Sequence, residues 1–106
     1  MLPLKKHRLV AADFQSAYDL YEARQEGLGG EFVKDFRRAY HQLRLSPLLY
    51  SIRFAGVRRL NLERFPYGIF YVASSDEILV LALLHASRDK ETVLADRRLT
   101  THKTPS

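Results

Sequence analysis

The sequence contains no cysteine among its 106 residues. This absence excludes disulfide bonds, thiolate metal sites and a cysteine nucleophile, and it is typical of a protein from a reducing compartment. No apolar run approaches the roughly 18 residues that a membrane span requires. The basic residues near the start are followed by no apolar stretch, so we expect no secretory signal. These absences together predict a cytoplasmic protein that does not enter a membrane.

The sequence also has little that would hold a metal ion or a cofactor. Its four histidines are scattered, and none has the paired spacing of a metal-binding helix or finger. They are His7, His41, His85 and His102. The glycine-rich run 27–30 follows a predicted helix, so it is typical of a helix cap rather than of a phosphate-binding loop. We therefore expect neither a metal nor a cofactor.

The remaining composition is that of one small globular domain. Hydrophobic residues make up 46% of the chain and charged residues 27%. A chain of this length buries enough surface for one core without covalent cross-links. We place the domain at residues 1–98. The segment 99–106 is poor in core-forming residues, so we expect it to be a flexible C-terminal tail.

Positive charge is concentrated in the middle third of the chain. The formal net charge is +5, yet residues 34–64 hold eight basic residues against two acidic ones, and residues 1–30 and 65–106 are each balanced. The eight are Lys34, Arg37, Arg38, Arg44, Arg53, Arg58, Arg59 and Arg64. Because the arginine fork binds phosphate and carboxylate alike, the excess favours an acidic partner, either a nucleic acid or an acidic protein segment. The alternative is that these arginines only solvate a helix and a strand.

Apolar periodicity predicts two helices after a first strand at 4–10. A helix over 14–26 has one apolar stripe, and Asp13 is placed to cap its N-terminus. The stripe consists of Phe14, Ala17, Tyr18, Tyr21 and Leu28. Glycines at 27–30 interrupt the pattern, and a second helix over 31–45 stops before a proline. Two helices joined by so short a turn form an antiparallel hairpin.

The second half of the chain is rich in β-branched and aromatic residues and predicts a sheet. Strands are expected at 57–63, 67–73 and 78–84, and the last of them is apolar on both faces, as a covered central strand should be. A short C-terminal helix follows at 90–98. The element order is therefore β-α-α-β-β-β. This order predicts an α+β fold in which a helical hairpin packs on one face of a small, mostly antiparallel sheet.

Several short motifs occur in order across residues 4–98. They are Ala12-Asp13-Phe14 with Ala17 and Tyr21-Glu22, Gly27-Leu28-Gly29 with Phe32, Ser46-Pro47 with Tyr50, Gly56-Val57-Arg58-Arg59 followed by Arg64 to Tyr71, and Leu81 to Asp89. In this order and spacing the sequence resembles the RelE/ParE superfamily, the toxins of type II toxin–antitoxin systems. The resemblance implies the same α+β fold and a cognate acidic antitoxin whose disordered segment wraps the toxin.

The resemblance leaves two activities open, and they need different surfaces. RelE-like members are ribosome-dependent nucleases that cleave mRNA, and such chemistry needs an acid, a base and cations for the phosphate. Here His85 could serve as acid or base, and Arg88 matches an arginine that follows the last strand. However, Gly68 stands where those members commonly carry an arginine, and no tyrosine follows Tyr71.

ParE-like members instead inhibit DNA gyrase and need only a docking surface. The turn at 27–29, the Arg58-Arg59 pair and the His85-x-x-Arg88 segment are closer to this branch, which includes plasmid-stabilisation factors. We therefore expect a gyrase inhibitor rather than an enzyme. The alternatives are an mRNA endonuclease whose partners are the ribosome and mRNA, and a basic nucleic-acid-binding relic without toxicity.

The arginines divide into two candidate sets. The residues expected to contact the target are Arg58, Arg59, Arg64 and Arg88. The residues expected to contact the antitoxin are Arg37, Arg38 and Arg44. Arg58 and Arg59 would point to opposite faces of one strand, so at most one of them can face a shared site. Each candidate also has an ordinary structural explanation, such as an ion pair for Arg64 or a hydrogen bond to backbone for His85.

Overall fold

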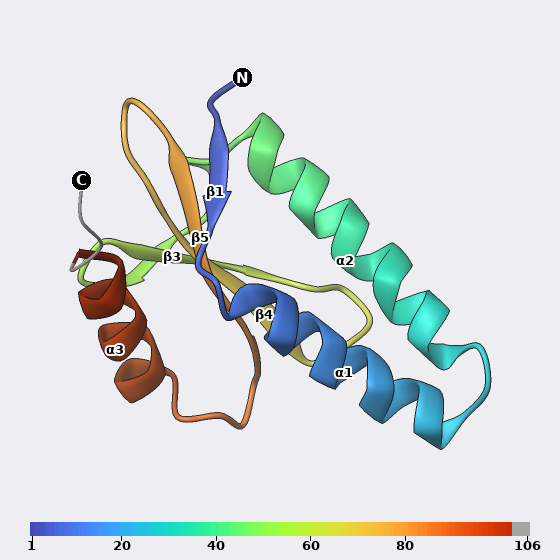
Figure 1. Cartoon of the computed structure of the whole chain (residues 1–106). Coiled ribbons are helices and arrows are strands. Elements are labelled where there is room, and N and C mark those ends of the chain that lie inside the picture. The colour runs from blue at the N-terminus through green and yellow to red at the C-terminus, as the bar shows by residue number, and fades with distance from the viewer. Residues whose placement is uncertain (103–106) are drawn as a thin grey trace.

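A five-stranded sheet lies between a pair of helices and a single third helix (Figure 1). The computed structural model describes residues 1–102. Its elements are β1 (Leu4–Lys6), α1 (Val10–Arg24), α2 (Leu28–Leu45), β2 (Ile52–Phe54), β3 (Val57–Asn61), β4 (Tyr67–Ala73), β5 (Ile78–His85) and α3 (Lys90–His102). The strand order is β1-β5-β4-β3-β2, in which β1 pairs with β5 in parallel and the other neighbours are antiparallel. The predicted α+β class and mostly antiparallel sheet are confirmed.

Side-chain alternation along the central strands builds a core on each face of the sheet. On β4, Ile69 and Tyr71 face the helical hairpin, whereas Phe70 faces the other way and packs with Leu94 of α3. All four side chains are buried. The strand β5 is apolar on both faces because both are covered, as its sequence predicts.

Aromatic side chains hold the hairpin to the sheet. The rings of Tyr21 and Phe65 lie 4.7 Å apart, and that of Phe32 lies 5.3 Å from that of Tyr67, both in edge-on geometry. Such pairs contribute roughly 0.5–1.5 kcal/mol each beyond the area that they bury. The predicted stripe on α1 therefore does form a contact with the sheet, with Ala17 and Tyr21 buried, and Phe32 of α2 is buried as well.

The connection between α1 and α2 is shorter than the glycine run predicts. Gly27 adopts a left-handed φ of 89°, and α2 begins at the next residue. The carboxylate of Glu22 accepts hydrogen bonds from the backbone N–H groups of Gly27 (3.0 Å) and Gly29 (2.9 Å). A Cβ on Gly29 would lie 2.7 Å from the ring of Tyr18, so the helices approach closely only because this residue is glycine.

Several element boundaries differ from the prediction. The first strand is shorter, because α1 begins at Val10, and Asp13 therefore lies inside the first turn instead of capping the helix. The strand β2 was not predicted, since three residues are too few to show alternation; a tight turn with positive φ at Ala55 (48°) and Gly56 (79°) folds it onto β3. The helix α3 continues to His102. Residues 103–106 of the predicted tail lie outside the described residues.

Asp13 closes the open edge of β5 together with Arg97, instead of capping α1. The strand β1 covers only Ile78–Val80, and a bulge at Leu81 follows. Beyond it, Arg97 donates to the carbonyl of Leu81 (3.1 Å), and the N–H of Leu83 donates to Asp13 (3.0 Å). Arg97 also binds the Asp13 carboxylate with both terminal nitrogens, one of them at 2.8 Å. The two side chains are 7% and 10% exposed, so this is a buried ion pair that joins α1, β5 and α3.

A second buried carboxylate, Asp35 of α2, holds the loop between β3 and β4. It accepts the backbone N–H groups of Glu63 (3.2 Å), Arg64 (2.8 Å) and Phe65 (3.2 Å), and Arg38 donates to it from the next helical turn (3.0 Å). Burial alone would raise the pKa of Asp35, but these hydrogen bonds outweigh it, so that the pKa lies below its ordinary value. The charged form therefore contributes to stability.

We expect Arg97→Met to lower the free energy of unfolding by roughly 3–5 kcal/mol, because it leaves the Asp13 carboxylate buried without its cation. Lys34→Met is the control, since Lys34 is 81% exposed in its ion pair with Glu31, and exposed pairs contribute less than about 1 kcal/mol. Urea unfolding followed by circular dichroism measures both. Equal losses in the two variants would contradict the role given to the buried pair.

We expect Asp35→Asn to lower the free energy of unfolding by about 2–4 kcal/mol at neutral pH, since an amide cannot accept all four donors. Because the folded pKa is depressed, the contribution of Asp35 is present above the unfolded value of about 4 and is lost as pH falls through the folded pKa. The difference between parent and variant should therefore shrink in acid unfolding below about pH 4. Asp76→Asn, in an exposed turn, is the control and should show no such difference.

Candidate functional site

The cationic middle of the chain does not form one patch in the structure. No acidic residue occurs between Asp35 and Glu63, and six arginines lie in that interval. They are Arg37, Arg38, Arg44, Arg53, Arg58 and Arg59. The fold distributes them over α2, the outer strand β2 and both faces of β3. Each arginine must therefore be judged by what its side chain contacts.

The three candidates for antitoxin binding on α2 differ in availability. Arg37 is exposed, and its side chain has no partner within residues 1–102. Arg38 is only 31% exposed and binds Asp35 and, at 3.4 Å, Glu63, so that it serves the fold. Arg44 is half-buried, and its Nε donates to the sulfur of Met1 at 3.3 Å. Of these three, Arg37 has the guanidinium that is available to a partner.

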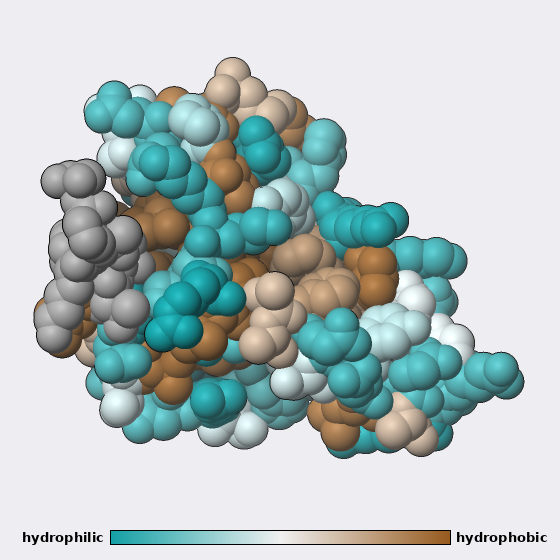
Figure 2. All heavy atoms as spheres, viewed as in Figure 1, coloured by the Kyte–Doolittle hydropathy of each residue, from teal (hydrophilic) through white to brown (hydrophobic). Residues whose placement is uncertain are grey.

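A groove of about 540 Å³ lies where α1 and α2 diverge. Its apolar lining residues are Val10, Ala11, Phe14 and Phe36, and its polar ones are Lys6, His7, Arg8 and Gln15. Figure 2 shows apolar side chains gathered between the two helices, with polar groups around them. The rings of Phe14 and Phe36 contact at 4.9 Å and remain partly exposed. We refer to this feature as the hairpin groove. The apolar stripe predicted for the first helix includes Phe14 and does not show that a groove lies beside it.

His7 closes one end of this groove as a neutral side chain. It is 7% exposed, and its Nδ1 accepts the backbone N–H of Leu9 at 3.1 Å. Its Nε2 is buried without a hydrogen-bond partner among the described residues. Burial lowers the pKa of His7, and the positive charges of Arg97 and Arg8 lower it further. His7 therefore adds no charge to the groove, whose cations are Lys6 and Arg8.

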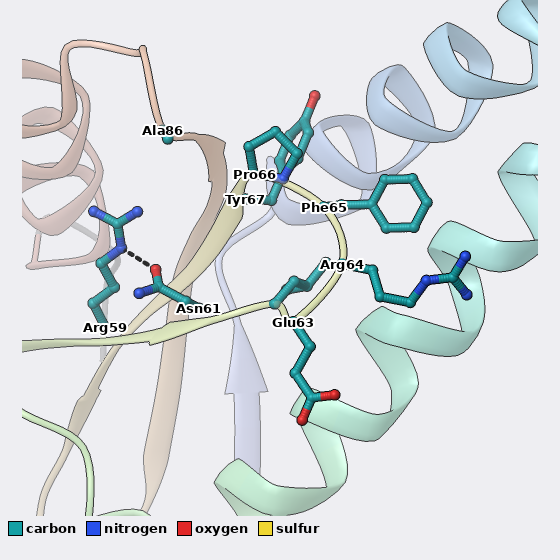
Figure 3. A pocket seen from close by; sticks show the side chains of 9 residues that line it. Arg59, Asn61, Glu63, Arg64, Phe65, Pro66, Tyr67 and Ala86 are labelled. Atoms are coloured by element: carbon teal, nitrogen blue, oxygen red, sulfur yellow. Dashed lines mark hydrogen bonds between the residues drawn. The ribbon is translucent and has the colours of Figure 1, made fainter.

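A second pocket, of about 390 Å³, lies at the end of β3 and β4 (Figure 3). Arg59 lines it, fixed by a hydrogen bond from its Nε to Asn61 (2.5 Å) and by the ring of Phe70, whose centre is 5.2 Å from the guanidinium. Burial lowers the pKa of Arg59, and the charge of Arg53 adds to this. A Cβ at Gly68 would lie 2.8 Å from Arg59 Nε. The glycine that departs from the RelE-like pattern thus makes room for an arginine from the neighbouring strand.

Two of the other target candidates are occupied by the fold. Arg58 donates to the backbone carbonyls of Tyr50 (2.7 Å) and Leu48 (3.3 Å) and so holds the loop that precedes β2. Arg64 lines the same pocket as Arg59, but its guanidinium points toward α2 and pairs with Glu31 at 3.3 Å (Figure 3).

His85 and Arg88 flank the turn after β5, and no hydrogen bond joins their side chains in the described part of the chain. The Nδ1 of His85 accepts the N–H of Ser87 (3.0 Å), so the neutral ring carries its proton on Nε2. Its ring packs edge-on against Tyr67 at 5.2 Å, on the hairpin side of the sheet. Arg59 lies on the opposite side, and the exposed side chain of Arg88 has no partner within residues 1–102. The candidate acid or base, His85, and one candidate cation, Arg59, thus lie on opposite sides of the sheet.

Neither a metal cluster nor a membrane span occurs in the described part of the chain. No group of three or more His, Asp or Glu side chains there is placed to hold a metal ion. None of the helices described combines the length and the apolar character needed to cross a membrane.

Comparisons with known proteins agree with the fold. The sequence model of the ParE toxin of the type II toxin–antitoxin system, parDE, matches residues 4–90. No curated protein matches. Ten chains of solved structures match, and one of them belongs to the chromosomal ParDE TA system from P. aeruginosa. That chain is 26% identical, with a TM-score of 0.64, and the match covers 82% of this chain and 98% of that one. Because the family match spans most of the sequence, the chain belongs to the ParE toxin family of type II toxin–antitoxin systems.

Proposed function

We propose that this ParE-family toxin inhibits DNA gyrase and is neutralised by a cognate acidic antitoxin. The observation that carries the proposal is the family match over residues 4–90. His85 packs on the hairpin side of the sheet and Arg59 on the opposite side, which favours a docking protein over a nuclease, because phosphodiester cleavage needs its groups to converge on one phosphate. A docking protein acts on a macromolecule through shape and charge alone.

The target-facing surface that we propose is the end of the sheet at the β3–β4 and β5–α3 loops. Arg59 and Ala86 line one pocket there, and Arg88 follows two residues after Ala86. The Arg88 side chain has no partner in the described part of the chain and Arg59 uses only its Nε, whereas one terminal nitrogen of Arg58 binds backbone carbonyls and one of Arg64 pairs with Glu31. An arginine that is already positioned loses little side-chain entropy when it binds a phosphate or a carboxylate. Of the four candidates, Arg59 and Arg88 therefore fit the role best.

The hairpin groove is the surface that we propose for the antitoxin. An amphipathic helix places apolar side chains along one face, and a groove lined by Phe14 and Phe36 accepts that face. The cations that line the groove, Lys6 and Arg8, complement an acidic segment, and Arg37 is a further exposed cation on α2. A disordered acidic chain that folds into a helix on binding would gain both the apolar contact with the groove and the attraction to these cations.

We expect the purified toxin to inhibit supercoiling by gyrase and to trap cleaved DNA, and we expect Arg59→Ala with Arg88→Ala to weaken the inhibition by about tenfold or more. Lys34→Ala, which removes an exposed cation from α2, is the control and should inhibit like the parent. A supercoiling gel over a toxin titration measures all three.

In cells, the same proposal expects early arrest of DNA synthesis with protein synthesis spared. Pulse labelling of both after induction distinguishes the targets. Early arrest of protein synthesis, with mRNA cut on programmed ribosomes in vitro, would replace gyrase with the ribosome. Salt-sensitive binding to bare DNA or RNA without either arrest would leave a nucleic-acid binder without toxicity.

For the antitoxin, we expect Ala11→Glu to weaken binding by about tenfold or more, since it places a negative charge in the hairpin groove where an acidic partner would lie. Ala11 is exposed near the start of α1, where a glutamate is well tolerated by the helix dipole. Ala23→Glu, at an exposed position near the other end of α1, is the matched control. Titration calorimetry with a candidate acidic antitoxin measures both, and equal affinities would remove the antitoxin from the groove.

A further inference from the structure

One end of the molecule exposes an unusual amount of apolar surface. Four large apolar side chains lie within eight residues, in the last turn of α2, the loop after it and β2, and each is more than half exposed. They are Leu45 (58%), Leu48 (66%), Leu49 (71%) and Ile52 (54%). We call this set the apolar edge. Single exposed leucines are ordinary, but a cluster on a small protein marks a surface that another molecule covers.

The backbone at the same place is also unsatisfied. The strand β2 is the outermost strand of the sheet. Ile52 pairs with Arg58, while the N–H of Arg59 donates to the carbonyl of Ser51. In antiparallel pairing this makes Ile52 a member of a non-hydrogen-bonded pair, so that its own N–H and C=O point away from β3. An extended peptide can therefore add to β2 through these groups.

Charge identifies the kind of peptide that fits. Between Asp35 and Glu63 the chain has no carboxylate, and the exposed Arg53 of β2 has no side-chain partner within residues 1–102. A second copy of this chain would bring the same uncompensated arginines against each other, which costs free energy. An acidic segment with apolar side chains at alternate positions instead covers the leucines with its apolar side chains, pairs a carboxylate with Arg53 and forms hydrogen bonds with the backbone of β2.

The apolar edge is continuous with the hairpin groove along α2. From Phe36 in the groove, the ring of Tyr40 follows at 5.5 Å, with Lys6 placed 6.0 Å from its centre. One turn further, Arg44 contacts Met1, which is 80% exposed, and Leu45 then begins the apolar edge. A single partner chain can thus follow α2 from the groove to β2 without leaving the protein surface.

We propose that an extended, acidic and apolar segment of the antitoxin adds to β2 as an additional strand and covers the apolar edge. This inference rests on the proposed function, because the partner is the antitoxin. It adds a second binding site that recognises backbone and alternate side chains, in contrast to the helix-binding groove.

The test uses the toxin alone and its complex with a candidate acidic antitoxin. Hydrogen exchange at the Ile52 amide should slow on complex formation by on the order of tenfold or more, because its unpaired N–H gains an acceptor. Leu49→Glu should weaken binding by about tenfold or more. Leu20→Glu is the matched control, since Leu20 is a 43% exposed leucine on α1, and it should bind like the parent. Ile52→Pro, which removes only the outward N–H of an edge strand, should also weaken binding, and Ile52→Val should not.

Three outcomes would overturn this inference, and they differ in whether the proposed function is also contradicted. Unchanged exchange at Ile52 and unchanged affinity for Leu49→Glu, with a loss for Ala11→Glu, would restrict the antitoxin to the hairpin groove and leave the proposed function standing. A free toxin that sediments as a dimer, and as a monomer after Leu49→Glu, would assign the apolar edge to a second copy. No binding of the acidic protein by any variant would remove the antitoxin proposal as well.

Discussion

The ion pair between Asp13 and Arg97 is the contact on which the arrangement of the layers depends. The strand β1 is too short to cover β5, and the bulge at Leu81 disturbs the edge further. An open edge in the middle of a structure leaves backbone groups unpaired, and a buried unpaired group is costly. The Asp13 carboxylate and the Arg97 guanidinium pair these groups. Asp13 accepts a backbone N–H of β5, Arg97 donates to a backbone carbonyl of β5, and the two side chains bind one another. The pair also attaches the helices on the two faces to one strand.

Several other arginines also bind groups of the fold, so the number of arginines is larger than the number available to a partner. Arg38 and Arg58 belong to the cationic middle of the chain, and Arg97 belongs to α3. All three donate hydrogen bonds to carboxylates or backbone carbonyls of the fold. An arginine that holds a loop in place cannot be withdrawn for a partner without a loss in stability. The surfaces proposed for partners instead use side chains that the fold leaves over, such as Arg37 and Arg88 on the outside and Arg59 above Gly68.

Local patterns predicted the elements, and long-range contacts decided the details. The stripe through Ala17 and Tyr21 and the two-sided apolar strand at 78–84 are local signals, and both were confirmed. Asp13 has the sequence context of a helix cap, but its partners lie 70 and 84 residues away, and no local pattern shows them. The strand β2 was missed for a similar reason, since three residues pair only because the turn at Ala55 and Gly56 returns the chain. For the site, composition located the arginines, but their availability depends on neighbours that only the fold brings together.

The separation of Asp13 from Arg97 by 84 positions also has a consequence in time. A ribosome that adds about 5–20 residues per second takes roughly 4–17 s to travel from one to the other. For most of that interval the strand that pairs with β1 from Ile78 onward has not been synthesised, and Arg97 is missing throughout. Contacts between residues so far apart in the sequence raise the contact order and form only after both partners have been synthesised. The toxin therefore cannot complete its architecture during translation of its first three quarters, and its maturation is postponed until the last helix emerges.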